Sequence, residues 1–229
     1  MKTLARKFSL GLVAVIVAVV LAAAGTLAYP HMAGLLYYKP RLDRLFAELH
    51  RDPVLIGALR EQNATLADKD EAWALSIDRT WNAERLQGGG PLQRAMMEKP
   101  ASQHLRHIVA QSGGLVSHAF LIDGKGRMAA EPFVSFNYWQ FDKPKFHYTF
   151  PLGPGARDVS WLERSWDGSH AVCWRAETMV DPEAGQPIGV LALEVDYFQL
   201  GFSGCKEQPI HTPEERATNK IDHATGRLK

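Results

Sequence analysis

The segment GGLVSHAFLIDGKG, residues 113–126, marks a change in the periodicity of the sequence. Before it, apolar residues recur every three or four positions, which is the spacing of amphipathic helices. From residue 116 onward they recur with a period of two, which is typical of strands. The paired glycines suit a helix end, and the sequence DGKG suits a hairpin turn. The chain should therefore fold as helices followed by strands, an α+β arrangement.

Four helical regions are predicted upstream of this segment. Residues 35–66 carry an apolar stripe, with a break near Pro53 because proline suits a first helical turn. Residues 68–86 carry tryptophan and isoleucine at steps of four, and three glycines follow them. Residues 91–97 and 101–111 are expected to form two shorter helices.

Downstream of the segment, strand-like stretches are joined by short turns. These stretches are residues 116–122, 127–131, 146–150, 159–165, 171–180 and 187–195. Strands that follow each other through short turns must pair in antiparallel fashion. The expected fold is therefore α+β, with long N-terminal helices followed by an antiparallel sheet.

The N-terminus carries a basic cluster and then a long apolar run. Lys2, Arg6 and Lys7 precede an uncharged stretch at residues 8–28, about the 20 residues that a helix needs to cross a bilayer. Basic residues before such a run favour a cytoplasmic N-terminus, so the chain after Tyr29 should lie outside the cytoplasm. The small residues near the end of the run also suit a signal peptidase. An uncleaved anchor and a cleaved signal peptide both remain open.

Composition and motifs argue against several functional classes. The 229 residues carry a net charge of only +1, whereas a nucleic-acid-binding face usually shows a basic excess. The chain lacks a nucleophile elbow, a phosphate-cradling loop and the HExxH and CxxC motifs. His104 and His107 are three residues apart but lack an obvious third metal ligand. We therefore expect no enzyme, no cofactor and no metal site.

The sequence has two cysteines, Cys173 and Cys205. Outside the cytoplasm such a pair tends to oxidise. A bridge between them would attach the polar C-terminal tail to the strand region. Two free thiols are the alternative.

Five segments, in the correct order, resemble motifs of the extracellular PAS-like sensor domains called Cache or PDC domains. They are SIDRTWNAE (76–84), SQHLR (102–106), AFLIDGKG (119–126), NYWQFDKPKF (137–146) and VDPEAGQPIG (180–189). The resemblance covers about residues 40 to 200 and implies a five-stranded antiparallel PAS-like sheet. It also implies a small-molecule pocket over the sheet, covered by the fourth segment. Three positions depart from the family pattern there: Asn137, Phe141 and Lys143 stand where an aspartate, a glycine and an acidic residue are usual.

Two groups of residues are candidates for the ligand site. In the fourth segment, Tyr138, Trp139, Asp142 and Lys145 combine aromatic walls with a few charges. On the strand predicted at residues 171–180, alternation places Arg175 and Glu177 on one face, opposite Val172, Trp174 and Ala176. A guanidinium beside a carboxylate could hold a ligand that is a carboxylate or an amine. The alternatives are a tryptophan that only fills the core and an ordinary surface ion pair.

The expected organisation follows from these features. Residues 1–34 would form a cytoplasmic stub with the anchor or signal peptide, residues 35–203 a single Cache-like domain, and residues 204–229 a polar tail. The expected protein is a small-molecule sensor in the inner membrane with a periplasmic domain, or in the periplasm after cleavage. No output domain is evident, so it would act through a partner signalling protein.

A structural or assembly protein that keeps the fold but has lost its ligand is the alternative. An open, polar-lined cavity under Trp139 would favour the sensor. A cavity filled by Phe141 would favour the structural role.

Overall fold

The computed structural model describes residues 19, 29, 32–165, 168–201 and 205–206. The apolar run at residues 8–28 lies, apart from Val19, outside these residues, as does the predicted tail after Lys206. Among the residues that are described, no helix combines the length and the apolar character that crossing a bilayer requires.

The first half of the domain is helical, as predicted. Its elements are the π-helical turn η1 (Gly34–Tyr38) and the helices α2 (Lys39–Leu49), α3 (Pro53–Thr65), α4 (Glu71–Leu86), α5 (Pro91–Glu98) and α6 (Pro100–Gln111). Asp52 and Asp70 cap α3 and α4, because their carboxylates accept hydrogen bonds from backbone N–H groups of the first turn. Gly113 and Gly114 follow α6 with positive φ, which a glycine adopts without strain.

The second half forms one antiparallel sheet. Its strands are β1 (Val116–Asp123), β2 (Met128–Ala130), β3 (Arg157–Val159), β4 (Glu163–Arg164), β5 (Ala171–Val180) and β6 (Pro187–Asp196). The order is β2-β1-β6-β5-β3, and β4 also pairs with β5. The α+β fold with an antiparallel PAS-like sheet is confirmed, with six strands in place of the expected five.

One predicted strand is wrong. Residues 146–150 lie in the short helix α7 (Pro144–His147) and lead into the 3₁₀ turn η2 (Phe150–Leu152). Each of these turns contains a proline near its start, and proline fixes a φ angle that suits a first helical turn. The aromatic residues Phe146, Tyr148 and Phe150 recur at every second position, which is also the period of a strand. Their inward-facing member, Phe146, is buried from a helix instead.

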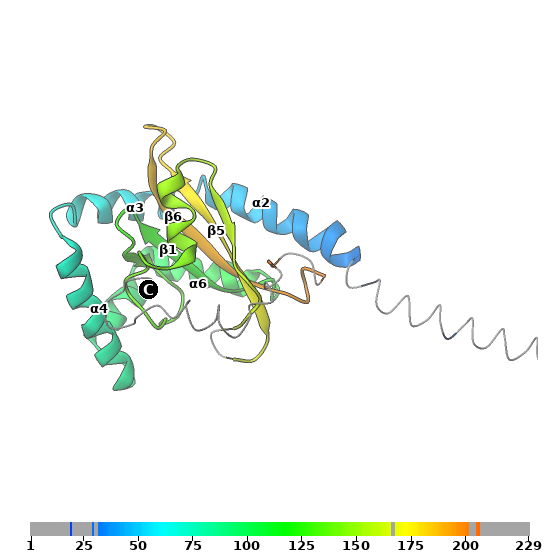
Figure 1. Ribbon diagram of the computed structural model, residues 1–229, viewed down its shortest axis with the longest axis horizontal. Coiled ribbons are helices and arrows are strands. Elements are labelled where there is room, and N and C mark those ends of the chain that lie inside the picture. The colour runs from blue at the N-terminus through cyan, green and yellow to red at the C-terminus, as the bar shows by residue number, and fades with distance from the viewer. Residues whose placement is uncertain (1–18, 20–28, 30–31, 166–167, 202–204, 207–229) are drawn as a thin grey trace, which may run out of the picture.

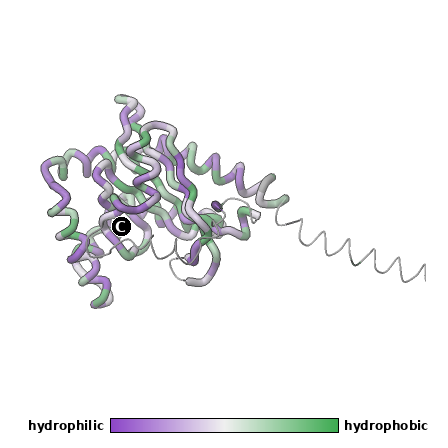
Figure 2. Tube along the Cα trace, in the orientation of Figure 1, coloured by the Kyte–Doolittle hydropathy of each residue, from purple (hydrophilic) through white to green (hydrophobic). Residues whose placement is uncertain are grey.

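Two hydrophobic cores cover the two faces of the sheet. On one face α2, α3 and α6 pack against residues such as Leu121 and Leu193. On the other face α4, α5 and α7 pack against residues such as Ile122 and Val190. Alternation along β1 and β6 separates these two sets. Figure 1 shows the strands between the helices, and Figure 2 shows apolar and polar residues alternating along α2.

The N-terminal helical turn lies against the end of the sheet region. Gly34, the first residue of η1, approaches the backbone at Leu200 and Gly201 so closely that an added Cβ would lie 2.4 Å from the carbonyl carbon of Leu200. Only glycine fits here, because backbone atoms cannot yield as a flexible side chain can. The start of the helical layer and the end of β6 are therefore neighbours.

A disulfide joins Cys173 on β5 to Cys205, with the two Cα atoms 5.5 Å apart. The next residue, Lys206, donates its backbone N–H to the carbonyl of Ser160 at 3.0 Å and forms an ion pair with Asp158. These contacts attach the chain after β6 to the edge of the sheet.

We expect Cys205→Ser to lower the free energy of unfolding by about 3 kcal/mol, because the bridge closes a loop of 32 residues. Chemical denaturation of the oxidised protein measures the loss. Dithiothreitol should destabilise the wild type by a similar amount and leave the variant unchanged. If dithiothreitol does not change the free energy of unfolding of the wild type, no bridge forms.

Candidate ligand pocket

The floor of the pocket is a set of side chains that lie side by side on three neighbouring strands. In one row, His118 on β1 and Trp174 on β5 are both paired with Glu194 on β6. In the next row, Phe120 and Ala176 are both paired with Ala192. The two alanines belong to the buried core on this face, beside the aromatic residues.

A cavity of about 440 Å³ lies over His118, Phe120, Trp174 and Glu194, within the usual size range of small-molecule sites. Its walls come from α4, α7, β4 and the segment at residues 134–140. The residues that line it are Arg85, His118, Phe120, Val134, Ser135, Phe136, Asn137, Gln140, Lys143, Lys145, Glu163, Arg164, Ser165, Trp174 and Glu194. Polar groups therefore surround an aromatic floor.

Lys145 is the central cation of this cavity. It projects from α7, and its ammonium lies 3.8 Å from the centre of the Trp174 ring and 4.4 Å from that of Phe120. The two rings stack on each other with centroids 4.6 Å apart. Burial lowers the pKa of Lys145 to about 8, although Glu163 and Glu194 oppose this shift. No described residue accepts a hydrogen bond from the ammonium, so its donors are available to a ligand.

Two further titratable groups are buried beside the pocket. Burial lowers the pKa of His118 to about 4, so this floor residue is neutral at pH 7. Burial raises the pKa of Glu131 to about 8. One oxygen of Glu131 accepts the backbone N–H of Ser135 at 3.3 Å, while its Oε2 has no hydrogen-bond partner among the described residues. Glu131 is therefore mostly protonated at neutral pH.

Helix α4 holds the segment that forms the pocket wall. Oδ1 of Asp78 accepts the backbone N–H groups of Tyr138 and Trp139 at 2.8 and 3.0 Å. One turn later, the indole N–H of Trp81 donates to the carbonyl of Ser135 at 2.9 Å. The spacing of three residues places both side chains on one face of the helix. This pair is the aspartate and tryptophan of the motif at residues 76–84.

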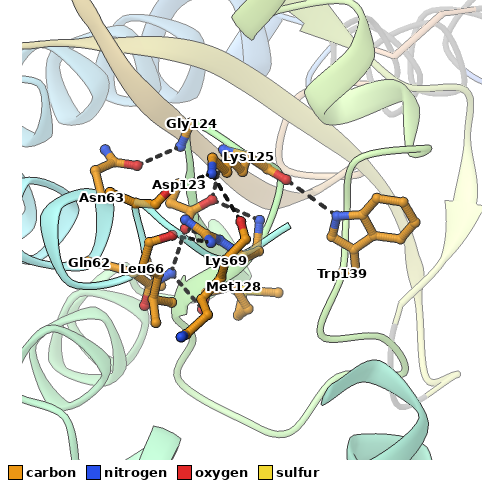
Figure 3. A network of polar contacts seen from close by, with 12 residues as sticks. Gln62, Asn63, Leu66, Lys69, Asp123, Gly124, Lys125, Met128 and Trp139 are labelled. Carbon is orange, nitrogen blue, oxygen red and sulfur yellow. Dashed lines mark hydrogen bonds and ion pairs between the residues drawn. The ribbon is translucent and has the colours of Figure 1, made fainter. Parts of the chain in front are cut away.

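The β1–β2 turn holds the same segment from its other side. The backbone N–H of Gln140 donates to the carbonyl of Gly126 at 2.6 Å, and the indole N–H of Trp139 donates to that of Lys125 at 3.3 Å. The Lys125 ammonium in turn donates to the carbonyl of Lys69 at 2.9 Å, just after α3 (Figure 3). Gly126 has φ near +76°, and an added Cβ would lie 2.6 Å from the Cα of Phe141. The turn and the wall are thus locked together.

The structure does not bring the six predicted site residues together. Lys145 lines the cavity. Tyr138 is buried in the core against Trp81, with ring centroids 6.1 Å apart. Trp139 stacks on Phe141 at 5.5 Å, and Asp142 pairs with its neighbour Lys143 at 3.0 Å. None of these three lines the cavity.

Arg175 and Glu177 lie on the opposite face of the sheet, where α2 packs. Their guanidinium and carboxylate groups are bonded at 2.8 Å, and Arg175 also pairs with Asp43 of α2. The prediction that they share a cavity with the loop residues is therefore not what the structure shows. Alternation along β5 was predicted correctly, but polarity was a poor guide to the ligand-facing side. Charges on a strand can be buried against a helix when the helix supplies partners.

Sequence reasoning missed most of the floor. Trp174 was placed on the face opposite the expected site, and His118, Phe120 and Glu194 were not singled out. The floor residues come from three strands, and only the strand register shows that His118 and Trp174 both lie beside Glu194.

No protein-family model matches the chain, and no curated protein matches it. Solved structures do resemble it. The sensor domain of the V. cholerae histidine kinase DctB has 16% identity and a TM-score of 0.37 over 74% of this chain and 62% of that one. The extracellular domain of the putative histidine kinase vpHK1S-Z8 has 13% identity and a TM-score of 0.46 over 76% and 56%. The E. coli DcuS sensor domain has 15% identity and a TM-score of 0.36 over 65% and 96%.

The chain spans about three fifths of the length of the first two of these chains. All three are sensor or extracellular domains of signalling proteins.

We expect Glu131→Gln to stabilise the protein at neutral pH. The folded pKa of about 8 lies above the ordinary value of 4.5, so the folded state binds more protons between these limits. Stability therefore falls as pH rises through this window, by on the order of 2–3 kcal/mol at pH 7. Denaturation midpoints at pH 5, 7 and 8.5 measure it. The loss of stability with rising pH that Glu131 causes should be absent in the Glu131→Gln protein. Equal pH profiles for both proteins would contradict a protonated Glu131.

Proposed function

We propose that the chain is a small-molecule sensor whose ligand binds in the cavity over the sheet. The observation that carries the proposal is the Lys145 ammonium, a partly desolvated cation with free hydrogen-bond donors above a stacked pair of aromatic rings. An acidic group on the ligand would accept from this ammonium in a charge-assisted hydrogen bond. The apolar part of the ligand would lie on Trp174 and Phe120. A carboxylate is thus favoured over an amine as the group that Lys145 holds.

The position of Phe141 supports a sensor over a purely structural protein. Its side chain is 48% exposed and stacks on Trp139, so it leaves the cavity open. A fold that had lost its ligand would gain stability by filling such a space, because cavities lose packing contacts. The polar lining supplied by Asn137, Gln140 and Glu194 is also suited to orienting a ligand.

We further propose that the domain lies outside the cytoplasm and reports to a partner signalling protein. The basic cluster followed by an apolar run supports export or anchoring, and the bridge from Cys173 to Cys205 suits an oxidising compartment. The described residues form a single sheet domain with its helices, and the proposed partner would carry the signal further.

The ligand proposal predicts a specific response in a thermal-shift screen. Carboxylic acids, amino acids, polyamines and purines would be tested with the full chain in detergent. An acid-bearing compound should raise the melting temperature, because a ligand that binds the folded state stabilises it. Lys145→Met should weaken its binding about ten- to hundredfold, the usual effect of losing a charge-assisted contact. Binding should also weaken above pH 8, where the free ammonium loses its proton.

Lys69→Met is the matched control, because Lys69 is a surface lysine paired with Asp68 and does not line the cavity. It should leave the thermal shift unchanged. Compounds that stabilise the Lys145→Met protein as well as the wild type would place the ligand elsewhere. A screen in which no compound stabilises the protein would favour the structural role.

The topology proposal is tested with reporters fused after Lys229. An alkaline phosphatase fusion, which is active only outside the cytoplasm, should be active. A green fluorescent protein fusion, which folds in the cytoplasm, should be dark when exported by the same route. Replacing Lys2, Arg6 and Lys7 with glutamine should reduce phosphatase activity, since these charges set the orientation. An inactive phosphatase fusion with a fluorescent counterpart would overturn the proposal.

A further inference from the structure

Strand β5 connects the ligand cavity to α2. Trp174 forms part of the cavity floor, and the next residue, Arg175, points to the opposite face. Successive side chains of a strand always point to opposite faces, so the two side chains share one stretch of backbone. A displacement of Trp174 therefore displaces Arg175.

Arg175 is the centre of an ion cluster that holds α2. Its Nε donates to Oε1 of Glu177 at 2.8 Å, and its Nη1 pairs with Asp43. The guanidinium carbon lies 4.4 Å from the centre of the Phe46 ring, a cation–π contact. Nε2 of His50 lies 2.9 Å from Oε2 of Glu177. Asp43 and Phe46 of α2 and His50 at its C-terminal end lie on one face because they are three and four residues apart.

The centre of the cluster is sensitive to small displacements because Arg175 and Glu177 are largely desolvated, whereas Asp43 is half exposed. Arg175 is only 8% exposed, and Glu177 remains ionised there. Burial would raise the pKa of Glu177, but hydrogen bonds from His50 and Arg175 outweigh it and hold the pKa below its usual value. Charge pairs in such surroundings are strong when well aligned and costly when separated.

Helix α2 is the helix of this layer that depends most on side chains for its attachment. The backbones of α3 and α6 approach the strands more closely than the backbone of α2 does. Helix α2 is instead held by long side chains, including the Arg175 cluster and Phe46. It also continues directly from η1, the first helical turn of the described domain. The docking of α2 on the sheet therefore depends on how these side chains are aligned.

We propose that α2 is the output element of the domain and that the Arg175 cluster couples it to the cavity through β5. A change around Trp174 alters the alignment of Arg175 with Asp43 and Glu177, and so alters how tightly α2 docks. The inference rests on the proposed ligand site and adds the route by which a change at that site reaches α2.

The test is a double-mutant cycle read by hydrogen exchange of the α2 amides in the full chain. Lys145→Met perturbs the cavity without needing a known ligand. It should change α2 exchange by about threefold or more when the cluster is intact, since docking sets the opening equilibrium. In an Arg175→Met background, α2 should already exchange faster, and Lys145→Met should have no further effect. Asp43→Asn, at a half-exposed α2 position, is a milder variant should Arg175→Met fold poorly.

Arg60→Met is the matched control. Arg60 joins α3 to Asp181 after β5 with a hydrogen bond of 2.6 Å, so its loss removes a helix-to-sheet ion pair that does not involve α2. In this background Lys145→Met should still change α2 exchange. The coupling would be overturned if Lys145→Met did not change α2 exchange in the wild-type background. It would also be overturned if Lys145→Met still changed α2 exchange in the Arg175→Met protein. The proposed ligand site is tested separately, because it would be contradicted by a thermal-shift screen in which no compound stabilises the protein.

Discussion

The carboxylate of Asp78 holds the segment on which the pocket depends. It accepts two consecutive backbone N–H groups, those of Tyr138 and Trp139, which would otherwise be buried without partners. A carboxylate that accepts backbone donors forms charge-assisted hydrogen bonds, stronger than those between neutral groups. The segment at residues 134–140 has no strand neighbours apart from one isolated bridge at Trp139. Its position over the sheet is therefore set by α4 on one side and by the β1–β2 turn on the other.

The pocket that results is unusual in its charge balance. Lys145, Glu131 and His118 are all buried or half-buried, and burial moves each pKa toward the neutral form of the group. Neutral Glu131 and His118 add no charge at pH 7, so the charges at the cavity come from Lys145 and from the other ionisable side chains that line it, which are Arg85, Lys143, Glu163, Arg164 and Glu194. A ligand that restores the charged state of Lys145 takes up protons when it binds near pH 8. Proton uptake would then accompany the binding of such a ligand.

Much of the fold could be predicted from local sequence. Helix caps at Asp52 and Asp70, paired glycines after α6 and a period of two in β5 and β6 are short-range signals. Residues 144–152 could not be predicted in this way, because their aromatic residues alternate as in a strand while their prolines favour helical turns. The motif at residues 76–84 was found from its resemblance, but its role as the anchor of the wall depends on a contact 60 residues away.

The site was harder to predict than the fold for a physical reason. A ligand pocket requires a space, and the residues that line it here come from segments far apart in the sequence, such as Arg85 of α4, His118 of β1 and Trp174 of β5. Charged residues drew attention to Arg175 and Glu177, yet their partners are Asp43 and His50, more than 100 residues earlier in the chain. Charge on a strand does not reveal whether a helix or a ligand will neutralise it.

The contact between Gly34 and the backbone at Leu200 has a mechanical consequence. Because the entry of the chain into the helical layer touches its exit from the sheet, a tension applied across residues 34 and 201 would load that contact first. The chain reaches residue 201 from β6, which is held on both sides by hydrogen bonds to β1 and β5. The domain would then yield by separation of its two ends before its sheet opens. A bulkier residue at position 34 would hold these ends apart even without tension.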